Sequence, residues 1–143
     1  MKVIVKKFNA EAVIPSYATE GSACFDITAI YSVQRNIVNN TQVFGTGLAF
    51  EIPKGHVMLV FSRSGDGFKR DIRLSNCVGV IDSDYRGELF IKHVSDGVNP
   101  PDRFDGPRRV AQGMILPFTQ VEFIQGELTE TARGDGGFGS TGV

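Results

Sequence analysis

Short apolar segments separated by glycine, proline and polar residues dominate the hydrophobic pattern of this chain. Alternation of apolar and polar residues, or a short continuous apolar run, is typical of β-strands. Only residues 63–70 are predicted to form a helix, and that helix is short. Strands at this spacing, with almost no helical periodicity, indicate an all-β fold, a distorted barrel or jelly roll. The predicted strands are 2–8, 21–29, 42–52, 57–61, 72–74, 76–81, 88–94, 109–118 and 120–124.

The central part of this pattern is the stretch 76–94. Asn76 to Ile81 and Glu88 to Val94 are strand-like, and the polar segment Asp82 to Gly87 separates them. Because that segment ends in glycine, which tolerates positive φ, we predict a β-hairpin with a tyrosine and two carboxylates at its tip. From this stretch alone, a solvated turn and a tip that closes over a flat ligand remain equally open.

The chain shows no internal repeat and no domain boundary, so we expect one domain over 1–143. A β-barrel core is predicted for 1–125 and a flexible glycine-rich arm for 126–143. The last thirteen residues, TARGDGGFGSTGV, hold five glycines and too little apolar mass to order themselves. They nearly fit a phosphate-loop pattern, but Ser140 stands where that pattern requires lysine, so we reject that interpretation.

Composition narrows the class of protein further. A chain of 143 residues suits one domain with a normal core. Its net charge of -1 argues against a nucleic-acid-binding protein, which usually carries a basic face. No stretch approaches the ~20 apolar residues needed to cross a membrane. Cys24 and Cys77 are the only cysteines, which indicates neither a disulfide framework nor a thiolate zinc site. A cytoplasmic location is the simplest expectation.

Five segments in one order resemble the trimeric dUTPase family. They are GSACFDITA (21–29), SRSG (62–65), NCVGVIDSDYRGEL (76–89), RRVAQGMI (108–115) and RGDGGFGSTG (133–142). The resemblance implies a jelly-roll-like, β-clip subunit in a homotrimer. It also implies hydrolysis of dUTP to dUMP and pyrophosphate with Mg²⁺, at active sites that each take segments from all three chains.

The resemblance assigns the nucleoside end of the substrate to the third segment. Asp82 matches the carboxylate that contacts the 3′-hydroxyl and activates the attacking water, a role that suits a general base. Tyr85 matches the ring packed under the sugar, which excludes a 2′-hydroxyl. Asn76, with backbone near Gly79, matches the group that reads uracil. Each residue also has a plainer interpretation, as a turn aspartate, a half-buried tyrosine and a strand-end asparagine.

Phosphate and metal roles fall on three other segments. Arg63, Ser64 and Gly65 match a phosphate site at the start of a short helix, and Gln112 matches a further phosphate contact. Asp26 matches the acid that supports Mg²⁺ through its water molecules. The alternative for Asp26 is a buried acid paired with an arginine such as Arg109.

The arm carries the remaining implied contacts. Arg133 matches a γ-phosphate contact and Phe138 the ring that stacks on uracil, while Gly139, Ser140 and Thr141 match further substrate contacts. An arm that orders over the ligand would act as a lid that excludes bulk water.

The chain differs from the usual family pattern at two places, and two other functions remain as alternatives. The family usually has an apolar residue where this chain has Asp66, a carboxylate that should weaken phosphate binding unless it points away. The loop 96–104 is longer than usual and would suit a regulatory nucleotide-binding protein on the same scaffold. A dCTP deaminase would need a glutamate where this chain has Lys92, which cannot replace that general base at neutral pH.

Overall fold

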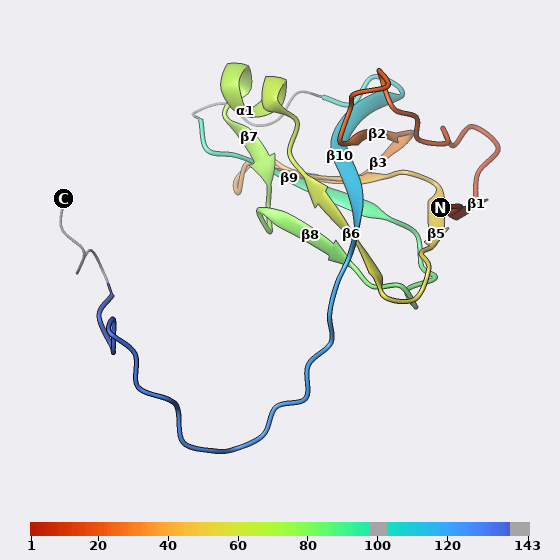
Figure 1. Ribbon diagram of the computed structural model, residues 1–143. Helices are drawn as coiled ribbons and strands as arrows, with labels where there is room; N and C mark the ends of the chain where they lie inside the picture. The colour runs from red at the N-terminus through yellow and green to blue at the C-terminus, as the bar shows by residue number, and fades with distance from the viewer. Residues whose placement is uncertain (98–102, 138–143) are drawn as a thin grey trace.

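The regular secondary structure of the described residues consists almost entirely of short antiparallel strands (Figure 1). The computed structural model describes residues 1–97 and 103–137. The all-β class expected from the sequence is confirmed. The elements are β1 (Ile4–Lys7), β2 (Phe25–Ala29), β3 (Tyr31–Asn36), β4 (Thr41–Gly45), β5 (Leu48–Glu51), β6 (His56–Phe61), α1 (Ser64–Arg70), β7 (Ile72–Leu74), β8 (Val78–Ile81), β9 (Phe90–Ser95) and β10 (Arg108–Pro117).

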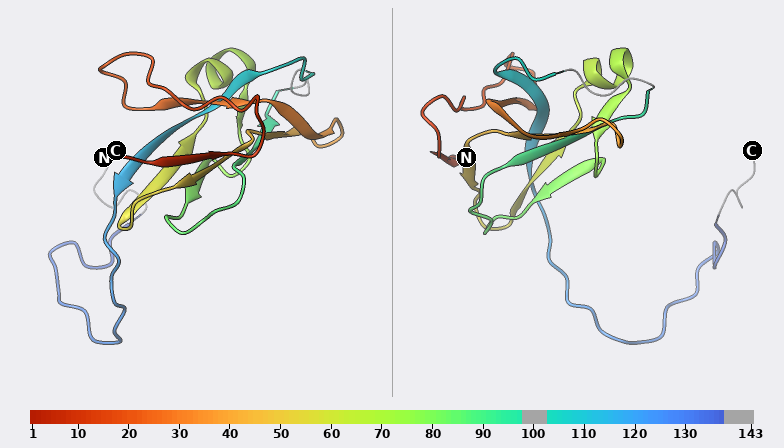
Figure 2. Two further views of the ribbon diagram at one scale, coloured as in Figure 1. Left: turned by 90° about the vertical axis from the view of Figure 1, so that its right-hand side faces the viewer. Right: turned by 180° about the vertical axis from the view of Figure 1, so that it is seen from behind.

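Two four-stranded sheets and one two-stranded sheet enclose the core. Their strand orders are β2-β10-β6-β8, β3-β4-β9-β7 and β1-β5. Figure 2 shows the two larger sheets from the side and from behind. One hydrophobic cluster joins Ile27, Met58 and Val60 of the first sheet to Phe44 and Ile91 of the second. Burial of these apolar surfaces is the main force that holds the sheets together. In the described part of the chain, the sheets keep free edges and do not close into one barrel.

The predicted hairpin over 76–94 is wrong. β8 pairs with β6, with Val78 opposite Phe61 and Ile81 opposite Met58. β9 pairs with β4 and β7 in the other sheet, so both of its edges are already used. The segment 82–89 is therefore a crossover between sheets. Apolar alternation predicted both strands correctly, but it carries no information about which strand pairs with which.

Three other strand predictions need correction. The predicted strand 42–52 is divided between β4 and β5, because the chain turns at Thr46 and Gly47, where φ is +67°. The strand expected over 120–124 does not form, since no strand is present in residues 118–137. β3 was not predicted, because only Tyr31 and Val33 of its six residues are apolar.

Helix α1 and a buried histidine lie at one end of the sandwich. Arg63 precedes the helix in an extended conformation, and Asp71 ends it with φ of 52°. The His93 side chain is 2% exposed, and its Nε2 lies 2.7 Å from the carbonyl oxygen of Val110. Burial lowers the pKa of His93, so the neutral ring is the stable form inside the sheet sandwich.

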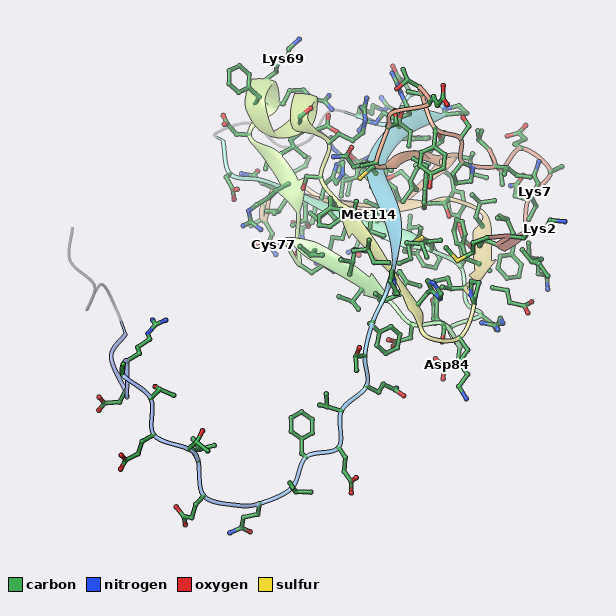
Figure 3. All side chains as sticks on the ribbon, in the orientation of Figure 1. Lys2, Lys7, Lys69, Cys77, Asp84 and Met114 are labelled. Carbon is green, nitrogen blue, oxygen red and sulfur yellow. The ribbon has the colours of Figure 1, made fainter. Side chains whose placement is uncertain are left out.

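Beyond β10 the chain leaves the body of the protein. Figure 1 shows the segment after Pro117 running away from the sheets, and Figure 3 shows its side chains projecting into solvent. Phe123 is 93% exposed and Leu128 is 95% exposed, so neither contributes to the core of this subunit. Among the described residues, no helix has the length and apolar character needed to cross a membrane.

Candidate active site

A wedge-shaped cavity separates β8 from β9. These strands belong to different sheets and do not pair with each other. The space between them has a volume of about 300 Å³. Asn76 and Gly79 line it from the β8 side, and Leu89 and Lys92 are among the residues on the β9 side. A Cβ at position 79 would lie 3.1 Å from Cβ of Val60 and 3.8 Å from Nδ2 of Asn76. Glycine therefore keeps this wall open to a flat ligand.

A second hollow continues from the wedge towards Asp82 and Tyr85. It has a volume of about 280 Å³ and shares Val80, Ile81, Leu89 and Phe90 with the wedge. The Tyr85 hydroxyl donates a hydrogen bond of 3.0 Å to the carbonyl oxygen of Glu88. The Tyr85 ring covers Gly87, where a Cβ would lie 2.4 Å from the hydroxyl oxygen. Asp82 is exposed at the edge of this hollow.

The crossover that carries Asp82 and Tyr85 is anchored at its end. Oε1 of Glu88 accepts hydrogen bonds of 2.7 Å from the Tyr31 hydroxyl and from the backbone N–H of Gly47. Next to it, the Thr46 hydroxyl donates to the carbonyl oxygen of Leu89 at 2.8 Å. Burial and the Glu88 carboxylate raise the pKa of Tyr31 to about 12, so its hydroxyl remains a donor at neutral pH. Sequence reasoning missed Tyr31, Gly87 and Glu88, because their roles depend on contacts made in the folded chain.

An arginine-rich cluster lies beside α1, where β2 and β10 begin and β6 ends. Asp26 accepts from Arg63 Nε at 3.3 Å and from Arg109 Nη1 at 2.9 Å. Gln112 donates to the carbonyl oxygen of Ser62 at 2.9 Å, while Ser64 and Gly65 are exposed at the start of α1. The structure thus brings together five of the residues expected at the phosphates and the metal: Asp26, Arg63, Ser64, Gly65 and Gln112.

The surroundings of Asp26 fit an indirect metal contact better than a direct one. Each of its two oxygens already accepts a hydrogen bond from an arginine, which fits the arginine pairing of the alternative interpretation. The burial in that interpretation is not found, since the side chain is 27% exposed. Among the described residues, no three His, Cys, Asp or Glu side chains form a group that could hold a metal ion. A carboxylate oxygen has a second lone pair, so Asp26 can still accept a hydrogen bond from water bound to Mg²⁺.

Within one subunit, the arginine cluster and Asp82 lie far apart. Val78 is paired with Phe61, Asp82 follows four residues beyond Val78, and Arg63 follows Phe61 in the opposite direction. At about 3.3 Å per residue, Arg63 and Asp82 are about 20 Å apart along the strands. Figure 3 shows the same separation, with Lys69 of α1 and Asp84 of the crossover at opposite ends of the molecule.

The described part of the arm, 126–137, contributes no residue to these sites in this subunit. Arg133 Nε donates to the carbonyl oxygen of Gly136 at 2.9 Å, within the arm itself. The other arm residues expected at the substrate, Phe138, Gly139, Ser140 and Thr141, lie outside the described residues. The arrangement thus has three parts: a wedge leading to Asp82, an arginine cluster, and an arm.

Comparison with known proteins identifies the family. A sequence model of the dUTPase family matches residues 10–142, nearly the whole chain. The chain belongs to the dUTPase family. Deoxyuridine 5'-triphosphate nucleotidohydrolase of Nautilia profundicola is 43% identical, with 99% of each chain covered. The corresponding protein of a Hydrogenobaculum strain is 36% identical over 100% of this chain and 99% of its own length.

Solved dUTPase structures share this fold. The dUTPase of Staphylococcus bacteriophage 80alpha, solved with dUPNHPP, superposes with a TM-score of 0.80 and 28% identity, and 99% of each chain is covered. The dUTPase of phage phi11 of S. aureus superposes with a TM-score of 0.74 at 24% identity. The jelly-roll-like dUTPase fold expected from the sequence is confirmed, built here from facing open sheets.

Proposed function

We propose that this dUTPase-family chain hydrolyses dUTP to dUMP and pyrophosphate, with Asp82 as the general base. The observation that carries this proposal is the continuous path from the wedge between β8 and β9 to the hollow at Asp82 and Tyr85. The path is lined mainly by apolar residues at its entrance and has a carboxylate at its far end. That order fits a base, a sugar and then a reacting phosphate.

The wedge would bind uracil between strands that have no hydrogen bonds to each other. Asn76 and backbone groups near Gly79 would pair with the base edge. A base with the wrong donor and acceptor order would leave buried polar groups unpaired, so the wedge would discriminate against cytosine. The open space that Gly79 leaves beside Asn76 supports this role.

The sugar would lie against Tyr85. Its ring is fixed from two sides, by the hydroxyl contact to the carbonyl oxygen of Glu88 and by packing over Gly87. A rigid ring leaves no room for a 2′-hydroxyl beneath the sugar. This rigidity supports selection of deoxyribonucleotides over ribonucleotides.

Asp82 would accept a proton from a water molecule that attacks the α-phosphorus in line with the leaving group. A bond then forms between the water oxygen and the α-phosphorus, and the bond from that phosphorus to the bridging oxygen breaks. Pyrophosphate leaves and dUMP remains. The exposed position of Asp82 at the edge of the hollow gives such a water access to the carboxylate.

The triphosphate would be held by arginines and by Mg²⁺. When bound, Mg²⁺ would offset the negative charge of the phosphates. Asp26 would hold the metal's water molecules, as its remaining acceptor capacity allows. Arg63, the start of α1 at Ser64 and Gly65, and Gln112 would contact phosphate oxygens.

The proposed enzyme is a homotrimer with shared sites, and the position of the arginine cluster supports the sharing. The base would bind near Asn76 and the phosphates would extend past Asp82, away from the subunit's own Arg63. Because these two residues are about 20 Å apart along the strands, the arginines that meet the phosphates would come from another copy. The described part of the arm, up to residue 137, projects away from its own subunit. This supports the proposal that Arg133, Phe138, Gly139, Ser140 and Thr141 close over a neighbouring site.

The two alternatives have less support. The deaminase needs a glutamate where this chain has Lys92, and the family match is to dUTPases. The regulatory interpretation depends on the loop 96–104, of which 98–102 lie outside the described residues.

Incubation with dUTP, dCTP and UTP, each with Mg²⁺, separates the three functions. Release of dUMP and pyrophosphate from dUTP alone is the expected result. Ammonia from dCTP would indicate the deaminase, and nucleotide binding without turnover would indicate the regulator. Sedimentation of the protein should give the mass of three chains. A monomer that is fully active would contradict the shared site.

A further inference from the structure

Carboxylates contact Arg63 on two sides. Its Nε lies 3.3 Å from Oδ1 of Asp26, and its Nη1 lies 3.9 Å from Oδ2 of Asp66. The same Nη1 donates to the carbonyl oxygen of Arg109 at 3.4 Å. A guanidinium carries five N–H groups in a planar fork. Within the described part of the chain, these contacts engage Nε and Nη1 and leave Nη2 for a ligand.

Asp66 points into the protein rather than into solvent. The residue is 4% exposed, although it belongs to the first turn of α1. Its Oδ1 contacts Nη2 of Arg70, and its Oδ2 has no hydrogen-bond partner among the described residues. At 3.9 Å, the contact from Oδ2 to Arg63 is an ion pair and not a hydrogen bond. A buried carboxylate is costly unless it is paired, and here two arginines compensate its charge.

We infer that Asp66 is a positioning residue that orients the Arg63 guanidinium for the triphosphate. The inference rests on the proposed function, which places Arg63 at the phosphates. Asp26 and Asp66 fix two edges of the guanidinium, so less side-chain entropy is lost when an anion binds at the third. The negative charge of Asp66 opposes the substrate only weakly, because Arg70 neutralises it and the carboxylate is buried. The gain in order therefore outweighs the repulsion.

The test compares Asp66→Asn with Asp71→Asn, which removes the same charge from the other end of the same helix. Asp71 has φ of 52°, a conformation that asparagine tolerates well. Asp66→Asn is expected to weaken binding of a non-hydrolysable dUTP analogue about tenfold, and to raise KM more than it lowers kcat. Affinity for deoxyuridine, which has no phosphates, should be unchanged. Asp71→Asn should match the wild type throughout.

A double-mutant cycle shows whether Asp66 acts through Arg63. Asp66→Asn should add no further loss of analogue affinity to the Arg63→Gln protein, because the group that it orients is already absent. A full additional loss in that background would overturn the inference. So would an equal loss of deoxyuridine affinity, or an Asp66→Asn protein that binds the analogue as tightly as the wild type does.

Two further measurements keep the test decisive. If Asp66→Asn lowers the thermal midpoint so far that the protein unfolds, Asp66→Leu replaces it, since an apolar side chain of similar volume removes the cost of burying a charge. The same tenfold loss is expected for Asp66→Leu. A wild-type protein that does not turn over dUTP would contradict the proposed function. An active wild type with an unaffected Asp66 variant would contradict only the role of Asp66.

Discussion

Tyr31 and Glu88 are joined by a hydrogen bond of 2.7 Å, although 57 positions separate them along the chain. The bond ties the end of the crossover 82–89 to β3. Because Tyr85 donates to the backbone carbonyl of Glu88, the same contact also supports the ring proposed to pack under the sugar. A residue outside all five family-like segments thus helps to fix the crossover that is proposed to bind the nucleotide.

Titration of Tyr31 should weaken the fold at high pH. The pKa of Tyr31 is about 12 in the folded protein and about 10 in the unfolded chain. Above pH 10 the unfolded chain loses this proton first, so the contribution of Tyr31 to stability is present below pH 10 and is lost as the pH rises to 12. The stability gap between the wild type and Tyr31→Phe should therefore shrink by about 1 kcal/mol over this range, a value reduced for partial exposure. Chemical denaturation at several pH values measures this gap, and a constant gap would contradict the prediction.

Asp82→Asn should abolish most turnover without abolishing binding. Asparagine keeps the shape of the side chain but cannot accept the proton of the attacking water, so kcat should fall by roughly 10²–10⁴. Affinity for a non-hydrolysable dUTP analogue should stay within a few-fold of the wild type. Asp84→Asn, an exposed residue of the same crossover, is the matched control and should keep near-normal kcat. Near-normal turnover in Asp82→Asn would refute the role of Asp82.

Gly87→Ala should reduce discrimination between dUTP and UTP. The added Cβ would lie 2.4 Å from the hydroxyl oxygen of Tyr85 and 2.6 Å from its Cζ, so the ring must move. A displaced ring would admit a 2′-hydroxyl, and the ratio of kcat/KM for dUTP to that for UTP should fall about tenfold or more. Gly21→Ala, where a Cβ meets no atom within 4 Å, is the control. An unchanged ratio in Gly87→Ala would show that the Tyr85 ring does not exclude the ribose.

Deletion of residues 131–143 should leave a folded protein with little activity. The deleted part that the structure describes, 131–137, forms no strand and adds nothing to the core cluster, so the thermal midpoint should change little. Without an arm to cover the triphosphate, dUTP turnover should drop at least tenfold. Circular dichroism and a pyrophosphate assay measure the two effects. Unfolding of the truncated protein would mean that the arm is structural.

The sequence by itself determined most of the strands, the short helix and the order of the family-like segments. These features are local, because strand-forming alternation and turn residues act over a few neighbouring positions. Asn76, Gly79 and Asp82 were assigned through the resemblance of one short stretch, 76–89, to the dUTPase family, and the strand and turn pattern alone left their roles open. The all-β class followed from the spacing of these segments.

Only the tertiary structure decided which strands pair and what each charged side chain meets. The pairing of β8 with β6 opens the wedge, and no local pattern distinguishes that partner from β9. Asp66 is buried although its charge partners Arg63 and Arg70 lie beside it in the sequence. The arginines on Asp26 and the contact from Tyr31 to Glu88 join residues from separate elements. Such contacts depend on how whole sheets pack, which is a property of the assembled core rather than of any single segment.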